Sequence, residues 1–176
     1  MKDAVKFTNL IKFLAEQHPL VKHSEDKMHF ASSLDEADNA YARNMCYPCV
    51  CLDLGDMRIN DSPQVERSVV LAFMQHVSDT GNEREKHEAF GLTGDIAIDF
   101  LAQLESIAEN HSKLSFVSRF NIDGAELVRV ELEEAGLYGW MCYFQHTFNL
   151  NSIVCEKHFG ADFDDKVADF FKSLVH

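Results

Sequence analysis

The residues whose types and spacing come closest to a chemical site are three cysteines, arranged as Cys46-x-x-Cys49-x-Cys51. Thiolates at such close spacing are typical ligands of zinc, which takes four ligands in a structural site. A fourth ligand would have to come from elsewhere in the chain. The distant side chains of a suitable type are Cys142, Cys155 and His146. The pattern therefore predicts zinc only where folding brings one of these to the three cysteines.

The same cysteines also fit a hydrophobic core. Cys49 and Cys51 lie in an apolar run that we expect to be a buried strand, and alternate residues of a strand share one face. A free cysteine in such a place behaves as a small hydrophobic residue. Structural zinc sites usually show a second short-spaced pair of ligands, which is missing here. We therefore expect core cysteines, with no metal and no other cofactor, and keep a zinc-binding protein as an alternative.

Other chemical patterns are incomplete. His87-Glu88 starts like a zinc-protease motif, but Gly91 stands where the second histidine should be. The segment 121–124 is similar to part of a calcium loop, yet Arg119 and Val130 occupy its first and last ligand positions. The sequence contains no nucleophile elbow, P-loop or dinucleotide fingerprint. We expect no catalytic residues, and we expect that the protein is not an enzyme.

Two further groups of ionisable residues have structural interpretations. His146 falls on the aromatic face of a strand, which favours a core or interface histidine, whereas His23 and His29 fall in a polar connection and should be solvated. The second group is acidic and close to a predicted strand end, where charge discourages pairing of sheet edges. These residues are Glu131, Glu133 and Glu134.

The first half of the chain predicts a helix followed by a hairpin. Apolar residues recur at helical spacing over residues 3–17, and Pro19 ends that pattern. A capping box at Ser33 predicts a short helix to about residue 43. Strands are expected over residues 49–54 and 68–74, with Pro48 before the first of them, because proline is excluded from strand interiors. The second strand is apolar on both faces and should be central.

The second half predicts a long helix and a meander. The helix should run over residues 83–110, with a kink or break near Gly94 and a buried stripe that includes Ile98. Strands are expected over residues 114–119, 126–132 and 140–149, with a hairpin turn at Asp123-Gly124 and another turn at Ala135-Gly136. A short amphipathic helix should cover residues 164–175. The fold class is α+β: a mainly antiparallel sheet, in two hairpin or meander units, around a long central helix with N- and C-terminal helices.

Composition limits the kinds of partner. The 176 residues fit one domain, residues 1–176, and 46% of them are hydrophobic, which is enough for a core. A formal charge of −13 repels phosphates and disfavours binding to nucleic acid or to an anionic membrane. The N-terminus lacks the pattern of a signal peptide, no stretch is apolar enough to span a membrane, and five cysteines suggest reduced thiols. We expect a soluble intracellular protein.

The order of the elements carries a resemblance. Two stretches are the most specific: Tyr47-Pro48-Cys49-Val50-Cys51-Leu52, which opens the first hairpin, and residues 137–144, LYGWMCYF, which form the long closing strand. Together with the N-terminal helix and the long helix between two antiparallel units, residues 3–150 resemble the tail-terminator and head-to-tail connector proteins of tailed phages. The resemblance implies a ring of identical subunits in the virion, stacked between portal and tail, through which DNA passes. It implies no catalytic residues.

Three functions therefore remain from the sequence. The first is a structural virion protein that forms a homo-oligomeric ring in the phage neck or tail, contacts portal, connector or tail proteins, and lets DNA pass without specific binding. The second is a small acidic binding or regulatory module, monomeric or dimeric, that meets a basic partner. The third is a zinc protein built on Cys46, Cys49 and Cys51, which would lose its fold on chelation.

Overall fold

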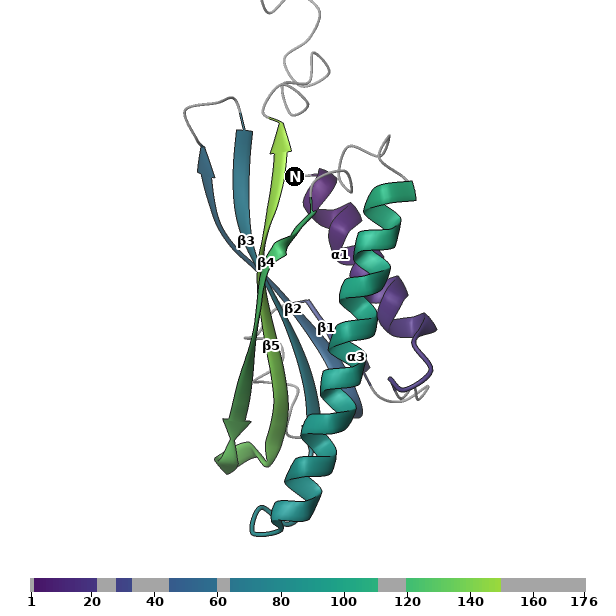
Figure 1. Cartoon of the computed structure of the whole chain (residues 1–176), viewed down its shortest axis with the longest axis vertical. Coiled ribbons are helices and arrows are strands. Elements are labelled where there is room, and N and C mark those ends of the chain that lie inside the picture. Colours follow the sequence, from purple (N-terminus) through teal and green to yellow (C-terminus); the bar gives the residue numbers. More distant parts are fainter. Residues whose placement is uncertain (1, 22–27, 33–44, 60–63, 111–119, 150–176) are drawn as a thin grey trace, which may run out of the picture.

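The computed structural model describes residues 2–21, 28–32, 45–59, 64–110 and 120–149. Within them the chain forms a sheet of five strands with two long helices (Figure 1). The expected helices over residues 33–43 and 164–175, the strand over residues 114–119, His23 and Cys155 lie outside the described residues. In chain order the elements are α1 (Lys2–Gln17), β1 (Met28–Ala31), β2 (Met45–Ile59), β3 (Gln64–His76), α3 (Glu83–Asn110), β4 (Phe120–Leu132), a 3-10 turn (Glu133–Ala135) and β5 (Leu137–Asn149).

The strand order is β1-β2-β3-β5-β4. β1 pairs with β2 in parallel, and every other neighbouring pair is antiparallel, so the α+β class with a mostly antiparallel sheet is confirmed. β3 is the middle strand, as its two apolar faces predict. It pairs with β5 along their whole length, from Gln64 opposite Asn149 to His76 opposite Leu137. This long central pair is the frame on which the other elements are placed.

Both helices lie on one face of the sheet, called the helix face below (Figure 1). Alternate strand residues point to it, including Leu52, Leu71 and Cys142, which stand in one row across β2, β3 and β5. The helices cover this row with two buried stripes, which are Phe7, Ile11 and Ala15 of α1 and Ile96, Ala97, Phe100 and Leu104 of α3. The predicted spacing of apolar residues therefore forms the main core.

The opposite face of the sheet carries the intervening residues. Cys51, Ala72 and Met141 form the next row across the same strands, and Cys51 and Ala72 are fully buried. They belong to a second cluster of buried residues with Cys49, Met74 and Leu137. β2 and β3 thus bury side chains on both faces, which explains why their sequences read as continuous apolar runs rather than alternating ones.

α3 has the predicted limits, but two expectations about its interior were wrong. It runs without a break through Gly94, where an added Cβ would lie 3.3 Å from the Nε1 atom of Trp140. The Trp140 indole N–H donates a hydrogen bond to the Phe90 carbonyl at 2.9 Å, so this glycine lets the helix approach the sheet closely. Ile98 is 59% exposed rather than buried, because it points away from the stripe formed by Ala97 and Phe100.

The proline in β2 also contradicts its prediction. Pro48 lies inside β2, which begins at Met45, and not before the strand. The register between β1 and β2 shifts between Met28 and Phe30, and the ladder from β2 to β3 begins only at Cys49. Pro48 therefore stands at an irregularity where its missing N–H interrupts no regular ladder, which is where a sheet tolerates proline.

The expected hairpin turn at Asp123-Gly124 is not a turn. β4 continues through both residues, and its register with β5 shifts between Asn121 and Glu126. From Asn121 to Glu126 β4 advances by five residues, whereas the paired residues of β5, Gln145 and Tyr143, are only two apart. The extra residues of β4 therefore form a bulge. The same turn-forming residues that favour a hairpin also suit a bulge, which needs an irregular backbone. The second turn is confirmed, with Gly136 in the left-handed region at φ 64° after the 3-10 turn.

β1 was not expected at all. It contains His29, which the sequence placed in a solvated connection but which is half-buried in the sheet. The strand has only four residues and little alternation, so its pairing with β2 depends on tertiary contacts rather than on its own pattern.

Candidate assembly interface

The cysteine cluster is not assembled as a metal site. Cys49 and Cys51 lie on the opposite face of β2 and are buried, as the core interpretation predicted. A hydrogen bond with Cys51 and, to a lesser extent, burial hold the pKa of the Cys49 thiol well above its usual value, so this thiol stays neutral. In the described part of the chain, no three His, Cys, Asp or Glu side chains are positioned to hold a metal ion.

The distant candidates lie on the other side of the sheet. Cys142 packs in the main core on the helix face. His146, four residues along the same strand, is 2% exposed and stacks on the Phe7 ring at 5.2 Å between centroids. His146 is therefore a core histidine, as expected. Neither side chain can join Cys49 and Cys51, because the sheet itself separates them.

Because the cysteines are divided between two faces, removal of metal is expected to leave the fold unchanged. Excess EDTA should not shift the midpoint of thermal unfolding, and metal analysis of the purified protein should give no stoichiometric zinc. A bound zinc ion, or a clear fall in the midpoint on chelation, would restore the zinc-binding interpretation.

The Cys142 thiol gives a prediction about pH. Burial raises its pKa to about 11, from an ordinary value near 9. Below pH 9 this thiol is protonated in the folded and the unfolded chain. Between about pH 9 and about 11 the unfolded chain loses the proton while the folded chain keeps it, so the free energy of unfolding should fall across that window. Urea unfolding at several pH values should show this fall in the free energy of unfolding. The fall should be smaller in Cys142→Ala, when each protein is compared with its own value at pH 8.

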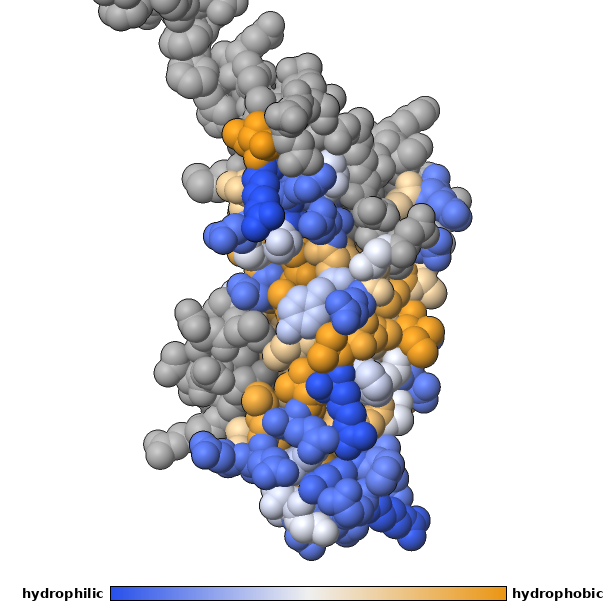
Figure 2. Space-filling model, turned by 60° about the vertical axis from the view of Figure 1, so that its left-hand side comes forward, coloured by the Kyte–Doolittle hydropathy of each residue, from blue (hydrophilic) through white to orange (hydrophobic). Residues whose placement is uncertain are grey.

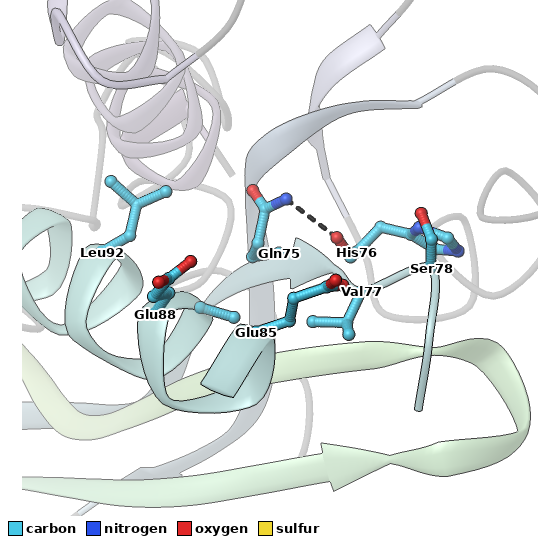
Figure 3. Close-up of a pocket in the computed structure, with 8 residues that line it drawn as sticks. Gln75, His76, Val77, Ser78, Glu85, Glu88 and Leu92 are labelled. Carbon is cyan, nitrogen blue, oxygen red and sulfur yellow. Dashed lines mark hydrogen bonds between the residues drawn. The ribbon is translucent and has the colours of Figure 1, made fainter. Parts of the chain in front are cut away.

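A hollow lies between the end of β3 and the first turns of α3 (Figure 3). It has a volume of about 250 Å³. Its two carboxylates already have partners, since Glu88 accepts a hydrogen bond from Arg84 Nε at 2.9 Å and Glu85 accepts one from Asn82 Nδ2 at 2.9 Å. His76 and Ser78 also line the hollow, and Gln75 Nε2 donates a hydrogen bond to the His76 carbonyl at 2.9 Å.

More informative are the two edges of the sheet. β1 pairs with β2 only as far as Ala31 opposite Cys51, so residues 52–59 of β2 have no described strand on their outer side. This half of β2 extends with β3 beyond the helices (Figure 1). Its residues from Gly55 onward are exposed, and two of them have large apolar side chains: Met57 is 58% exposed and Ile59 is 69% exposed. We call residues 52–59 the β2 edge.

β4 forms the other edge. It is 13 residues long and pairs only with β5 among the described strands. Val128 and Leu132 are exposed by 38% and 39%, so this β4 edge also presents apolar side chains to solvent. Figure 2, which turns this side of the molecule forward, shows hydrophobic residues gathered in a band across its middle, with mostly hydrophilic residues above and below. An open strand edge leaves backbone N–H and C=O groups without partners, which invites a further strand.

Charge limits where a strand can pair with β4. Glu131, Glu133 and Glu134 are exposed at the end of the strand and in the turn after it, as predicted. A partner strand carrying acidic groups would be repelled there, so pairing fits best with the middle of β4, around Val128. Arg129 in this region is already held by Glu131 at 2.6 Å and lies over the Phe90 ring, 3.9 Å from its centroid.

The sequence indicated only part of this interface. It marked the acidic end of β4 as a strand edge where charge discourages pairing. It gave no sign that β2 extends to Ile59 or that its outer half has no neighbouring strand among the described residues. No helix in the described part of the chain is both long and apolar enough to cross a membrane. Compared with protein-family models, with curated proteins and with solved structures, the chain gives no match.

Proposed function

We propose that this protein is a structural subunit of a tailed-phage virion, which associates with copies of itself into a ring in the neck or tail. The observation that carries the proposal is the pair of unlike open edges on one sheet. When the β2 edge of one subunit adds to the β4 edge of the next, the growing assembly still presents one free edge of each kind, the β2 edge at one end and the β4 edge at the other. Such a heterologous contact repeats until the rotation closes a ring.

The exposed side chains support this mode of association. Met57 and Ile59 on the β2 edge and Val128 and Leu132 on the β4 edge would be removed from water when the two edges pair. Backbone hydrogen bonds between added strands supply affinity, and the apolar side chains beside them supply selectivity. The acidic end of β4 restricts the register of the added strand.

The charge of the chain supports the second part of the proposal. A ring of subunits that each carry a formal charge of −13 would repel the phosphates of DNA. DNA would therefore pass through such a ring without being held. The two flat ends of the ring would contact portal or connector proteins on one side and tail proteins on the other.

Absolute mass tests the proposal. Light scattering of the purified chain across a dilution series, with negative-stain images of the main species, should show closed rings of one diameter. A strictly monomeric protein that also fails to assemble at high concentration would contradict self-association through its edges, and would favour the acidic binding module instead.

A further inference from the structure

The opposite face of the sheet carries a second apolar surface on the strands between the two edges, where Met141 stands opposite Val128 of the β4 edge and Val70 opposite Asp53 of the β2 edge. Val70 on β3 and Met141 and Tyr143 on β5 are adjacent there, since Val70 stands opposite Tyr143 in the ladder. Tyr143 is 41% exposed, and the other two are partly exposed. The Tyr143 hydroxyl donates to the Met141 sulfur at 3.3 Å, so the ring lies along the surface rather than standing out into water. We call these three residues the sheet patch.

We infer that the sheet patch binds the C-terminal segment of the same chain, residues 164–175, as an amphipathic helix. The described residues end at Asn149, and 27 residues follow. In this segment four apolar residues recur at helical spacing: Val167, Phe170, Phe171 and Leu174. The patch and this stripe are both apolar, and in a helix most of the charged residues of the segment would fall on the side opposite the stripe.

The length of the intervening chain permits the contact. Residues 150–163 can extend over roughly 45 Å, whereas the way back along β5 from Asn149 to Met141 is roughly 26 Å. Because β5 carries both the patch and the start of this connection, the segment is held at a high effective concentration beside its target. A helix of this length is marginal in isolation, so it needs such a surface in order to form.

The inference itself does not depend on the proposed ring. Only one alternative outcome does, in which a neighbouring subunit of the ring supplies the segment. The experiment is therefore made on full-length Ile59→Lys, which blocks the β2 edge and keeps the chain monomeric. Hydrogen exchange followed by mass spectrometry reports on the backbone amides of residues 164–175. We expect these amides to exchange more than about tenfold more slowly than in an unstructured peptide of the same sequence.

Two substitutions locate the contact. Tyr143→Lys and Phe171→Lys, each in the Ile59→Lys chain, should remove the protection of residues 164–175. The matched control Ile98→Lys changes a residue that is 59% exposed on α3 and should leave the protection intact. Unprotected amides in the monomer would overturn the inference, and so would protection that survives Tyr143→Lys. Protection that appears only in assembled wild-type protein would assign the segment to a neighbouring subunit and would also overturn it, while leaving the ring itself supported.

Discussion

Gly139→Ala is expected to prevent the chain from reaching its native fold. Gly139 lies in β5 opposite Met74 of β3, near one end of the long central pair of strands. A Cβ at this position would overlap the Phe73 carbonyl oxygen and lie 3.1 Å from the Met74 Cα. These are backbone atoms of the middle strand, so no side-chain rotation can relieve the clash. We expect the free energy of unfolding to fall by more than about 4 kcal/mol, which is a large share of the stability of a small domain.

Circular dichroism and urea unfolding of the purified variant measure this effect. Gly124→Ala is the matched control, because Gly124 lies in the neighbouring strand β4, and a Cβ there meets no atom within 4 Å. Its unfolding free energy should change by less than about 1 kcal/mol. A Gly139→Ala variant that unfolds cooperatively and as stably as the control would show that β3 and β5 are not packed as described.

The second large effect is expected from Phe100→Ala. Phe100 is 1% exposed and meets the Phe73 ring edge-on at 5.2 Å and the His18 ring at 5.7 Å between centroids. It therefore joins α3 to the sheet and to the end of α1. Truncation leaves a cavity between these three elements and should cost about 3–5 kcal/mol in unfolding free energy.

Urea unfolding of Phe100→Ala should be compared with that of Ile98→Ala, two residues earlier on the exposed side of the same helix. The control should lose less than about 1 kcal/mol. Equal losses in the two variants would contradict the assignment of Phe100, rather than Ile98, to the buried stripe.

The regular elements could be predicted from the sequence because their signals are local. The spacing of apolar residues and Pro19 define α1, the charged run after Asn82 begins α3, and strict alternation marks β5. Asn82 caps the start of this helix, since its side-chain oxygen accepts a hydrogen bond from the Arg84 backbone N–H at 3.1 Å. Each of these features is decided within a few residues along the chain.

The errors occur where a distant strand decides the structure. Asp123-Gly124 suits a turn and a bulge equally, and only pairing with β5 selects the bulge. Pro48 is accepted inside β2 because the ladder with β1 is irregular there and the ladder with β3 begins only at Cys49. β1 exists because β2 offers it an edge. The candidate interface was missed for the same reason, since an edge is defined by the absence of a neighbouring strand and not by any local pattern.

The central claim is that one subunit contacts the next through two unlike edges. Ile59→Lys blocks the β2 edge and Val128→Lys blocks the β4 edge, because a charged side chain on a strand edge opposes addition of a further strand. Val5→Lys is the control, since Val5 is 58% exposed on α1, a helix that forms part of neither edge. Each edge variant alone should be monomeric, whereas the control should assemble like the wild type.

Mixing the two edge variants is the most direct test. In the mixture each partner still has the edge that the other lacks, so we predict a single species of twice the monomer mass by light scattering, and nothing larger. Assembly by either variant alone would contradict the account, and so would a mixture that stays monomeric while the wild type forms rings, because the contact between subunits would then not join the β2 edge to the β4 edge.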